Sequence, residues 1–437
     1  MNKDLNLLKS AYDTWLAADT LRRRRLRYKR FTYGDQWSDI VADNAGGCCE
    51  ERHLLIDSGR RPLTNNLIRQ LVKTIVGRYR NSAAENNTYS GDPGSIDARN
   101  HLAELDCRLL EEFVISGCAI QRVCSERRPA GAGVWVDNVS PDNFFVNDFR
   151  DPRGFDIDFI GMLHDMTLGE ILNRFGNGSK RRCDALKALF MAPLHADFGI
   201  PDDAIGSSPA AVDFFTARNG RCRVIELWRL RGIETSDPYS HRWVDMRWHC
   251  TWLAPDGTVL ATYNSPYKHA SHPFAVKFYP LTDGEVHSFV EDVIDQQKTI
   301  NRLVVLVDTI LAASAKGALL FPLSQLPEGV SISDIARQWA KPEGLIPIRG
   351  GNQNDIPRQV ITSSAESGAY RLLELQMKLF EDVSGISDAL MGRNVSAATG
   401  ASLYDAQVRN AAIALTDLLD TFASFTTDRN AKVAAIA

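Results

Sequence analysis

Three long stretches of the chain carry apolar residues at the three- and four-residue spacing that is typical of amphipathic helices. They run over residues 285–315, 365–390 and 399–425, and a short segment containing Gly392 joins the second to the third. At about 1.5 Å per residue, the first helix would extend roughly 45 Å, which is long for a globular protein. The pattern therefore predicts a molecule in which long helices stand beside one another.

The rest of the chain mixes helical periodicity with the alternation that is typical of strands. The expected elements are helices over 2–33, 64–81 and 97–120, a hairpin over 120–139, short helices over 167–176 and 181–191, a surface loop over 198–220, and a β meander over 221–279 with strands at 222–230, 241–254, 259–263 and 274–279. The proline-rich insert 317–362 predicts short strands and a helix over 333–340. The fold class is therefore predicted to be α+β.

Four tryptophans belong to the predicted meander: Trp228, Trp243, Trp248 and Trp252. Aromatic residues interleaved along strands can stack on nucleic-acid bases, but strand-borne tryptophan far more often fills the core of a sheet. We therefore expect these side chains in the core.

Formal charge is nearly balanced, because 50 basic and 54 acidic residues give the 437-residue chain a net charge of −4. A protein that binds nucleic acid through its phosphates usually shows a clear basic excess. Any contact with DNA is therefore expected to be local or weak.

One segment departs from this balance, because seven of the nine residues from 22 to 30 are basic. The run begins with Arg22, Arg23, Arg24 and Arg25, inside the first predicted helix. It predicts contact with DNA phosphates, or else a solvated helix face that pairs with acidic neighbours or with another subunit. The sequence leaves these interpretations open.

The eight cysteines include no CxxC pair, and their spacing suits neither a zinc ribbon nor a disulfide framework in a chain this long. We therefore expect reduced thiols, no metal site and no cofactor. The polar N-terminus is unlike a signal peptide. The most apolar run, 303–307, is interrupted by Asp308 and is far shorter than the ~20 residues that span a bilayer. A soluble protein, intracellular when made and without a membrane partner, is expected.

Carboxylates crowd one short segment, which contains Asp148, Asp151, Asp156 and Asp158. A metal-dependent nuclease would use such residues to hold magnesium, so this activity is the alternative hypothesis for the chain. However, the segment is broken by proline and glycine, and no lysine or glutamate follows at the spacing of a nuclease. A solvated cluster of turns is the favoured interpretation, and the chain is expected not to be an enzyme.

Several segments, taken in order, resemble the portal proteins of tailed bacteriophages, which connect the phage head to its tail. The matching segments are FTYGDQW at 31–37, LTNNLIRQLVKTIVG at 63–77, VSPDNFFVND at 139–148, DQQKTINR at 295–302, and GISDALMG at 385–392 with ATGAS at 398–402. The resemblance covers nearly the whole chain.

This resemblance implies a portal-like fold within a cyclic ring of identical subunits, most often twelve. Its expected parts are a wing over 1–284, a first stem helix over 285–316, a clip over 317–362, a second stem helix over 363–391, a tunnel loop over 392–398, and a C-terminal helix over 399–437 that leads toward a crown. The tunnel loop would face DNA with Gly392, Arg393, Asn394, Val395 and Ser396.

The resemblance also implies a structural function without catalysis. The ring would stand at one vertex of the capsid in the virion, after assembly in the host cytoplasm, and would serve as the channel for packaging and ejecting double-stranded DNA. Its partners would be the terminase, a head–tail adaptor and the major capsid protein. Another phage connector, or a capsid-associated scaffold without a DNA channel, stays open as a further hypothesis.

Overall fold

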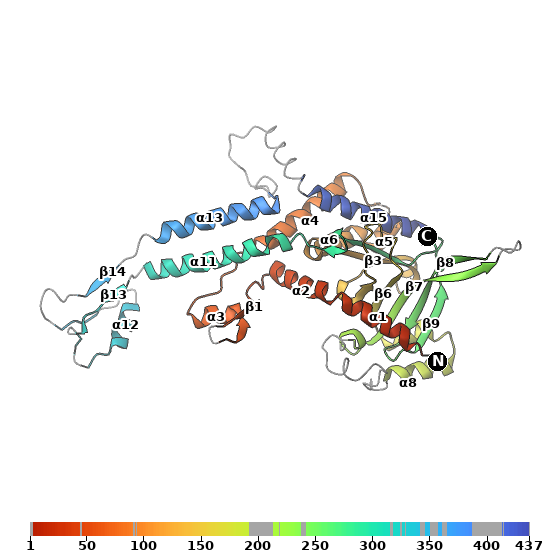
Figure 1. Cartoon of the computed structure of the whole chain (residues 1–437), viewed down its shortest axis with the longest axis horizontal. Helices are drawn as coiled ribbons and strands as arrows, with labels where there is room; N and C mark the ends of the chain where they lie inside the picture. Colours follow the sequence, from red (N-terminus) through yellow and green to blue (C-terminus); the bar gives the residue numbers. More distant parts are fainter. Residues whose placement is uncertain are drawn as a thin grey trace. The chain divides into compact units, whose positions relative to one another are not determined.

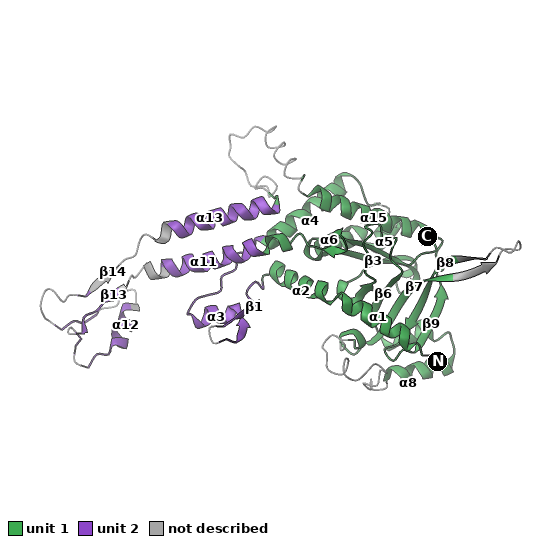
Figure 2. Cartoon of the chain, viewed as in Figure 1, with its two compact units in different colours: residues 1–34, 68–294, 385–437 green, residues 35–67, 295–384 purple. Residues whose placement is uncertain are grey.

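The computed structural model describes residues 3–191, 213–236, 242–314, 318–340, 346–349, 357–360, 365–386 and 413–436, apart from a few positions inside these ranges (Figure 1). The chain forms two compact units, coloured separately in Figure 2. Unit 1 comprises residues 1–34, 68–294 and 385–437, and unit 2 comprises residues 35–67 and 295–384. Helices and antiparallel sheets occur together, as in the predicted α+β class.

The first predicted helix, over 2–33, is confirmed as two successive helices. Helix α1 spans Leu5–Ala17 and α2 spans Asp19–Tyr33, with Ala18 between them. The side chain of Asp4 accepts a hydrogen bond from the Leu7 N–H at 3.0 Å and so caps the start of α1. Helix α2 ends where Gly34 adopts a left-handed conformation with a φ of 101°.

The next helices are α3 (Glu51–Asp57), α4 (Leu67–Glu85), α5 (Ile96–Asn100) and α6 (Leu102–Ser116). The prediction of one helix over 97–120 is wrong at its end. Gly117 has a φ of +72°, and a Cβ added there would lie 3.0 Å from the carbonyl oxygen of Tyr279. The chain therefore leaves the helix at this glycine, and the residues after it join a strand.

Two sheets make up most of the strand structure of unit 1. The three-stranded sheet has the order β10-β3-β4, with β3 at Cys118–Arg128, β4 at Gly131–Asn138 and β10 at Phe274–Phe278. The five-stranded sheet has the order β5-β6-β7-β8-β9, with strands at Phe144–Val146, Phe159–Met166, Cys222–Ser236, Arg242–Leu253 and Val259–Asn264. Together they confirm the predicted hairpin and the first three strands of the meander.

The fourth strand of the predicted meander belongs to the other sheet. Strand β10 pairs antiparallel with β3, with Phe274 opposite Arg122, rather than with β9. Strand β4 occupies one edge of β3, so its other edge is open to a strand from far along the chain.

The main core of unit 1 is formed by residues of both sheets and of helices α7 (Leu168–Phe175) and α8 (Lys180–Met191). Trp228, Trp248 and Trp252 are buried in it, which confirms the core prediction for three of the four tryptophans. The side chain of Trp243 lies outside the described residues. Helix α15 (Thr416–Ile436) packs on β3 and β10.

The first long helix begins later than its apolar periodicity predicts. Residues Glu285–Val286 form strand β12, which pairs with β11 (Pro280–Thr282), and a single 3₁₀ turn covers Glu291–Val293. Helix α11 then spans Ile294–Ser314. The apolar spacing runs on through Val290 and Val293 because both are buried, although they precede the helix.

Unit 2 contains α11 and α13 (Ala365–Ser384), which are connected through the insert between them. Within the insert, β13 (Ala318–Leu320) pairs antiparallel with β14 (Arg358–Val360), and α12 spans Ile332–Ala340. The predicted short strands and helix of the insert are thereby confirmed. Unit 2 also holds the hairpin of β1 (Ile40–Ala42) and β2 (Cys48–Glu50), followed by α3.

Helix α15 accounts for the C-terminal part of the third predicted long helix; residues 387–412, from the end of the second predicted helix into the third, lie outside the described residues. Among the helices that the structure describes, none is long and apolar enough to cross a membrane.

Candidate functional site

Parts of three of the sequence segments noted above, namely residues 35–37, 63–67 and 295–302, belong to unit 2 and meet around the first turns of α11. Four side-chain amides, those of Gln36, Asn66, Gln297 and Asn301, form one hydrogen-bonded group with the backbone of Asn65, and we call this group the amide cluster. Three of these side chains are at most 1 % exposed, namely Gln36, Gln297 and Asn301.

Within the amide cluster, Gln297 and Asn301 lie one turn apart on α11 and both reach the segment where α4 begins. Gln297 Oε1 accepts the Leu67 N–H at 2.9 Å, and Asn301 Oδ1 accepts the Asn65 N–H at 3.0 Å. Gln297 Nε2 donates to the carbonyl oxygen of Asn65 at 2.7 Å. The first N–H groups of a helix have no partner further along it, and α11 supplies a side-chain acceptor for one of them, the Leu67 N–H.

Two ion pairs lie beside the amide cluster. Lys298 Nζ lies 2.8 Å from Asp39 Oδ2, and Arg302 Nε lies 2.7 Å from Glu51 Oε1. Together with the amides, they join α11 to the segment that carries β1, β2 and α3. The arrangement holds a helix in place and offers no nucleophile or acid–base pair for catalysis.

The resemblance of these segments to portal proteins assigned no role to their amide side chains. The spacing could have indicated their burial. Gln297 and Asn301 are four residues apart in the sequence, and Ile300 between them belongs to the apolar stripe of the helix. Amides on a buried stripe require hydrogen-bond partners, and this requirement points to a buried polar contact.

Helix α13 is apolar on more than one face. Phe380 is buried, whereas a second stripe at helical spacing is 38–51 % exposed; we call it the leucine stripe: Leu372, Leu375, Leu379 and Val383. Leu306 and Leu311 of α11 are exposed to about the same extent, at 40 % and 41 %. Large exposed apolar patches are typical of surfaces that bind another protein, a membrane or a ligand.

The arginine run divides between the interior and the surface of unit 1. Arg25 is buried and pairs with Glu112 at 2.6 Å and with Asp142 at 2.7 Å. Arg22 is also buried, lies 3.6 Å from the ring centre of Trp15 and donates to the carbonyl oxygen of that residue. Burial lowers the pKa of Arg22, although the Asp19 carboxylate opposes this shift.

The other two arginines of the run are exposed. Arg23 pairs with Asp19 at 2.7 Å across one helical turn, and Arg24 also lies at the surface. Pairing with acidic neighbours is therefore observed for Arg22, Arg23 and Arg25. The prediction of a solvated face is wrong for Arg22 and Arg25, because both are buried. A contact of the run with DNA or with another subunit stays a prediction, and it concerns the two exposed side chains.

Two of the four aspartates of the nuclease hypothesis, Asp151 and Asp156, bind groups of their own turn. Asp156 Oδ2 accepts the N–H groups of Arg150 and Asp151, at 2.7 and 3.1 Å. The side chain of Asp151 pairs with Arg153 at 3.0 Å. These contacts lower the pKa of both Asp151 and Asp156. They support the interpretation of this segment as a cluster of turns.

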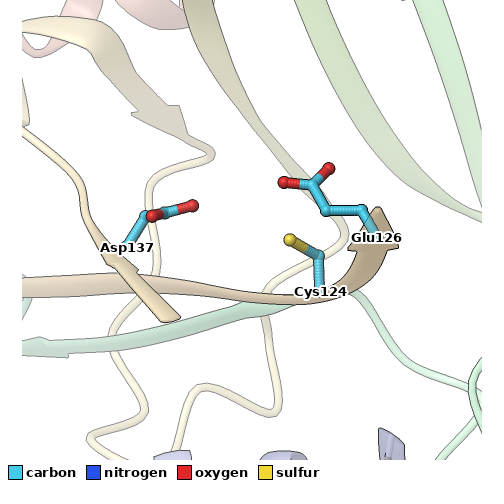
Figure 3. Close-up of side chains that lie close together, drawn as sticks. All are labelled: Cys124, Glu126 and Asp137. Carbon is cyan, nitrogen blue, oxygen red and sulfur yellow. The ribbon is translucent and has the colours of Figure 1, made fainter. Parts of the chain in front are cut away.

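One group among the described residues has the spacing of a metal site, and Figure 3 shows its side chains: Cys124, Glu126 and Asp137. Arginines already occupy these ligand atoms. Arg122 Nη1 lies 2.8 Å from the sulfur of Cys124, and Arg128 pairs with both carboxylates. Burial raises the pKa of Cys124 to about 12, so its sulfur carries a proton, whereas metals bind the thiolate. The donor set therefore fits guanidinium groups rather than a metal ion.

The residues expected to face DNA, from Gly392 to Ser396, lie outside the described part of the chain.

Comparison with known proteins gives one finding for the family. The model of the phage P22-like portal protein family matches residues 111–429, well over half of the chain. No match was found among curated proteins.

Proposed function

Because the chain belongs to the family of phage P22-like portal proteins, we propose that it forms the ring at one capsid vertex through which the genome is packaged and ejected. The portal family is structural, and the proposal assigns no catalysis to the chain. The ring would form in the host cytoplasm, join the major capsid protein and remain in the virion.

The observation that carries this proposal is the leucine stripe of α13. An isolated subunit leaves its four apolar side chains in water, and burial stabilises each by roughly 1.5–3 kcal/mol when it is complete. A neighbouring copy of the chain would cover the stripe, and repetition around a closed ring would leave no copy uncovered. The exposed Leu306 and Leu311 of α11 provide further apolar surface for the same contact.

Charge balance supports a conduit rather than a tight DNA-binding protein. Every phosphate that a fixed cation neutralises adds affinity, and affinity would resist movement of the DNA. A net charge of −4 over 437 residues suits a channel through which DNA moves.

We assign docking of the tail adaptor to the insert between α11 and α13. Four of its apolar side chains are 51–70 % exposed: Leu320, Leu323, Ile332 and Ile348. The terminase would meet the same end of the ring during packaging, before the adaptor binds.

The leucine stripe gives the sharpest test of the proposal. Purified wild-type protein is expected to form one large species by mass photometry. The double variant Leu375→Lys/Leu379→Lys places two charges on the stripe, and we expect it to stay monomeric with an unchanged circular-dichroism spectrum. The matched control is Glu374→Lys, an exposed position on another face of α13, which should assemble like the wild type. Assembly of the double variant would contradict the proposal.

We also propose that Arg393 contacts DNA, because it is the one charged residue in segment 392–398. In an in vitro packaging reaction, Arg393→Ala should form normal rings but package less DNA. Packaging at the wild-type level would remove this role from Arg393.

A further inference from the structure

A hollow of about 520 Å³ in unit 1 is lined by residues of β10, of α15 and of the segments 153–157 and 269–272. We call it the β10–α15 hollow. Its charged lining consists of three basic side chains, Arg153, Lys277 and Lys432, against one carboxylate, Asp428. This local basic excess contrasts with the whole chain, in which acidic residues slightly outnumber basic ones.

The two lysines of the hollow have neutral hydrogen-bond partners. Lys277 Nζ donates to the carbonyl oxygen of Pro152 at 3.0 Å and lies 3.4 Å from the hydroxyl of Ser424. Lys432 Nζ donates to the carbonyl oxygen of His272 at 2.9 Å. No carboxylate of the described residues lies within 4.0 Å of either ammonium. Arg153 differs, since Asp151 neutralises it.

His269 adds a donor that has no acceptor. Its Nδ1 accepts the Ser271 N–H at 3.0 Å, so the neutral ring carries its proton on Nε2. This Nε2 is buried and has no hydrogen-bond partner. Burial, together with Lys432, lowers the pKa of His269 to about 4, which keeps the ring a neutral donor near pH 7.

Lys432 is partly buried. Burial lowers the pKa of its ammonium to about 8, and Asp428 offsets this only in part. A desolvated cation without a close counter-ion destabilises a fold, and a bound anion offsets that cost. Ammonium groups bind phosphate as point charges, through several N–H groups at once.

We propose that the β10–α15 hollow binds a phosphate group, held by Lys277, Lys432 and the Nε2–H of His269. The phosphate group is either inorganic phosphate or part of a nucleic-acid backbone. A tetrahedral oxyanion offers enough acceptor oxygens for donors that come from three separate segments, whereas a single carboxylate offers two. The site does not depend on the proposed ring.

Calorimetric titration of the full-length protein with sodium phosphate, at constant ionic strength and pH 7, tests the site. Loss of one charge-assisted hydrogen bond weakens binding by about tenfold, so Lys277→Met/Lys432→Met should bind about a hundredfold more weakly. Lys277→Met alone should lose about tenfold, and it keeps the test valid if removal of Lys432 disturbs the fold. The matched control is Lys268→Met, an exposed lysine outside the hollow, which should bind phosphate like the wild type.

The source of the phosphate group is resolved by adding a short DNA duplex to the phosphate-loaded protein. Displacement of phosphate from the wild type would support a backbone site, and retention of phosphate would support a site for the free ion. Absence of phosphate binding to the wild type would overturn the proposal. Equal affinity of the wild type and of Lys277→Met would overturn it as well.

Discussion

Two buried polar clusters, one in each unit, hold elements together by different means. In unit 1, Glu226 on β7 is fully buried. Its carboxylate lies 2.9 Å from Arg122 Nε and 2.8 Å from His164 Nε2, and it also accepts a hydrogen bond from the Trp228 ring. Arg122 belongs to the three-stranded sheet, and the other residues of this Glu226 cluster belong to the five-stranded sheet. The amide cluster of unit 2 is neutral and binds backbone groups where α4 begins.

The difference shows how much each cluster depends on a single residue. A buried charge that loses its partner stays desolvated and uncompensated, whereas an amide that loses its partner leaves one neutral donor or acceptor unsatisfied. Loss of one partner should therefore disrupt the whole Glu226 cluster, which connects the two sheets of unit 1. Helix α11 is held by the weaker hydrogen bonds of the amide cluster, and a single substitution should remove only some of them.

The largest expected effect follows from removing the cation of the Glu226 cluster. Arg122→Met leaves Glu226 buried without its counter-ion, which should lower the free energy of unfolding by about 3–5 kcal/mol. Chemical denaturation followed by tryptophan fluorescence reports on this unit, because Trp228 and Trp252 are buried in its core. Arg127→Met, at an exposed position of the same strand, should change stability little. Equal losses in the two variants would contradict the role of the cluster.

A smaller effect is expected in the amide cluster. Gln297→Leu leaves the Leu67 N–H without its side-chain acceptor and should cost roughly 1–3 kcal/mol. Hydrogen exchange measured by mass spectrometry should show faster exchange at residues 65–67. The control is Gln296→Leu, since the side-chain oxygen of Gln296 is buried without a partner and its removal should not be destabilising. Unchanged exchange in Gln297→Leu would show that these hydrogen bonds do not hold the segment.

The smallest effect is a pH dependence that only one of the clusters should show. Burial alone would raise the pKa of Glu226, but Arg122 and the N–H groups of His164 and Trp228 outweigh burial and hold that pKa well below its usual range. The ionised carboxylate therefore stabilises the fold above the unfolded-state pKa of about 4.3, and this contribution is lost as the pH falls toward the lowered pKa.

This pH dependence is measured as a difference between variants. The destabilisation caused by Glu226→Gln should shrink by roughly 1 kcal/mol between about pH 5 and about pH 3.5. The destabilisation caused by Gln297→Leu should stay constant over the same range, because amides do not titrate. A parallel pH dependence of the two variants would remove the electrostatic distinction between the clusters.

Local patterns predicted the elements whose partners are near in sequence. The β3–β4 hairpin, the helices α7 and α8 and the strands and helix of the insert all follow from alternation, helical spacing and turn residues. The pairing of β10 did not, since Phe274 lies opposite Arg122, about 150 residues earlier in the chain. Period-two alternation identifies a strand but not the edge to which it binds.

The run from Arg22 to Arg25 also shows that the sequence alone does not reveal contacts with distant segments. A count of basic residues predicted one charged surface, yet Arg22 and Arg25 are buried and Arg23 and Arg24 are exposed. The spacing contained a signal, because Arg25 precedes the buried Tyr28 by three residues and Thr32 by seven, and so shares their face of the helix. Its partners Glu112 and Asp142 come from distant segments and could not be inferred from composition.

The most direct test of the central claim is electron microscopy of the purified full-length protein. We predict closed rings of identical subunits with a central pore wide enough for duplex DNA. A population of stable monomers, or of assemblies without such a pore, under conditions in which the chain is folded would contradict it.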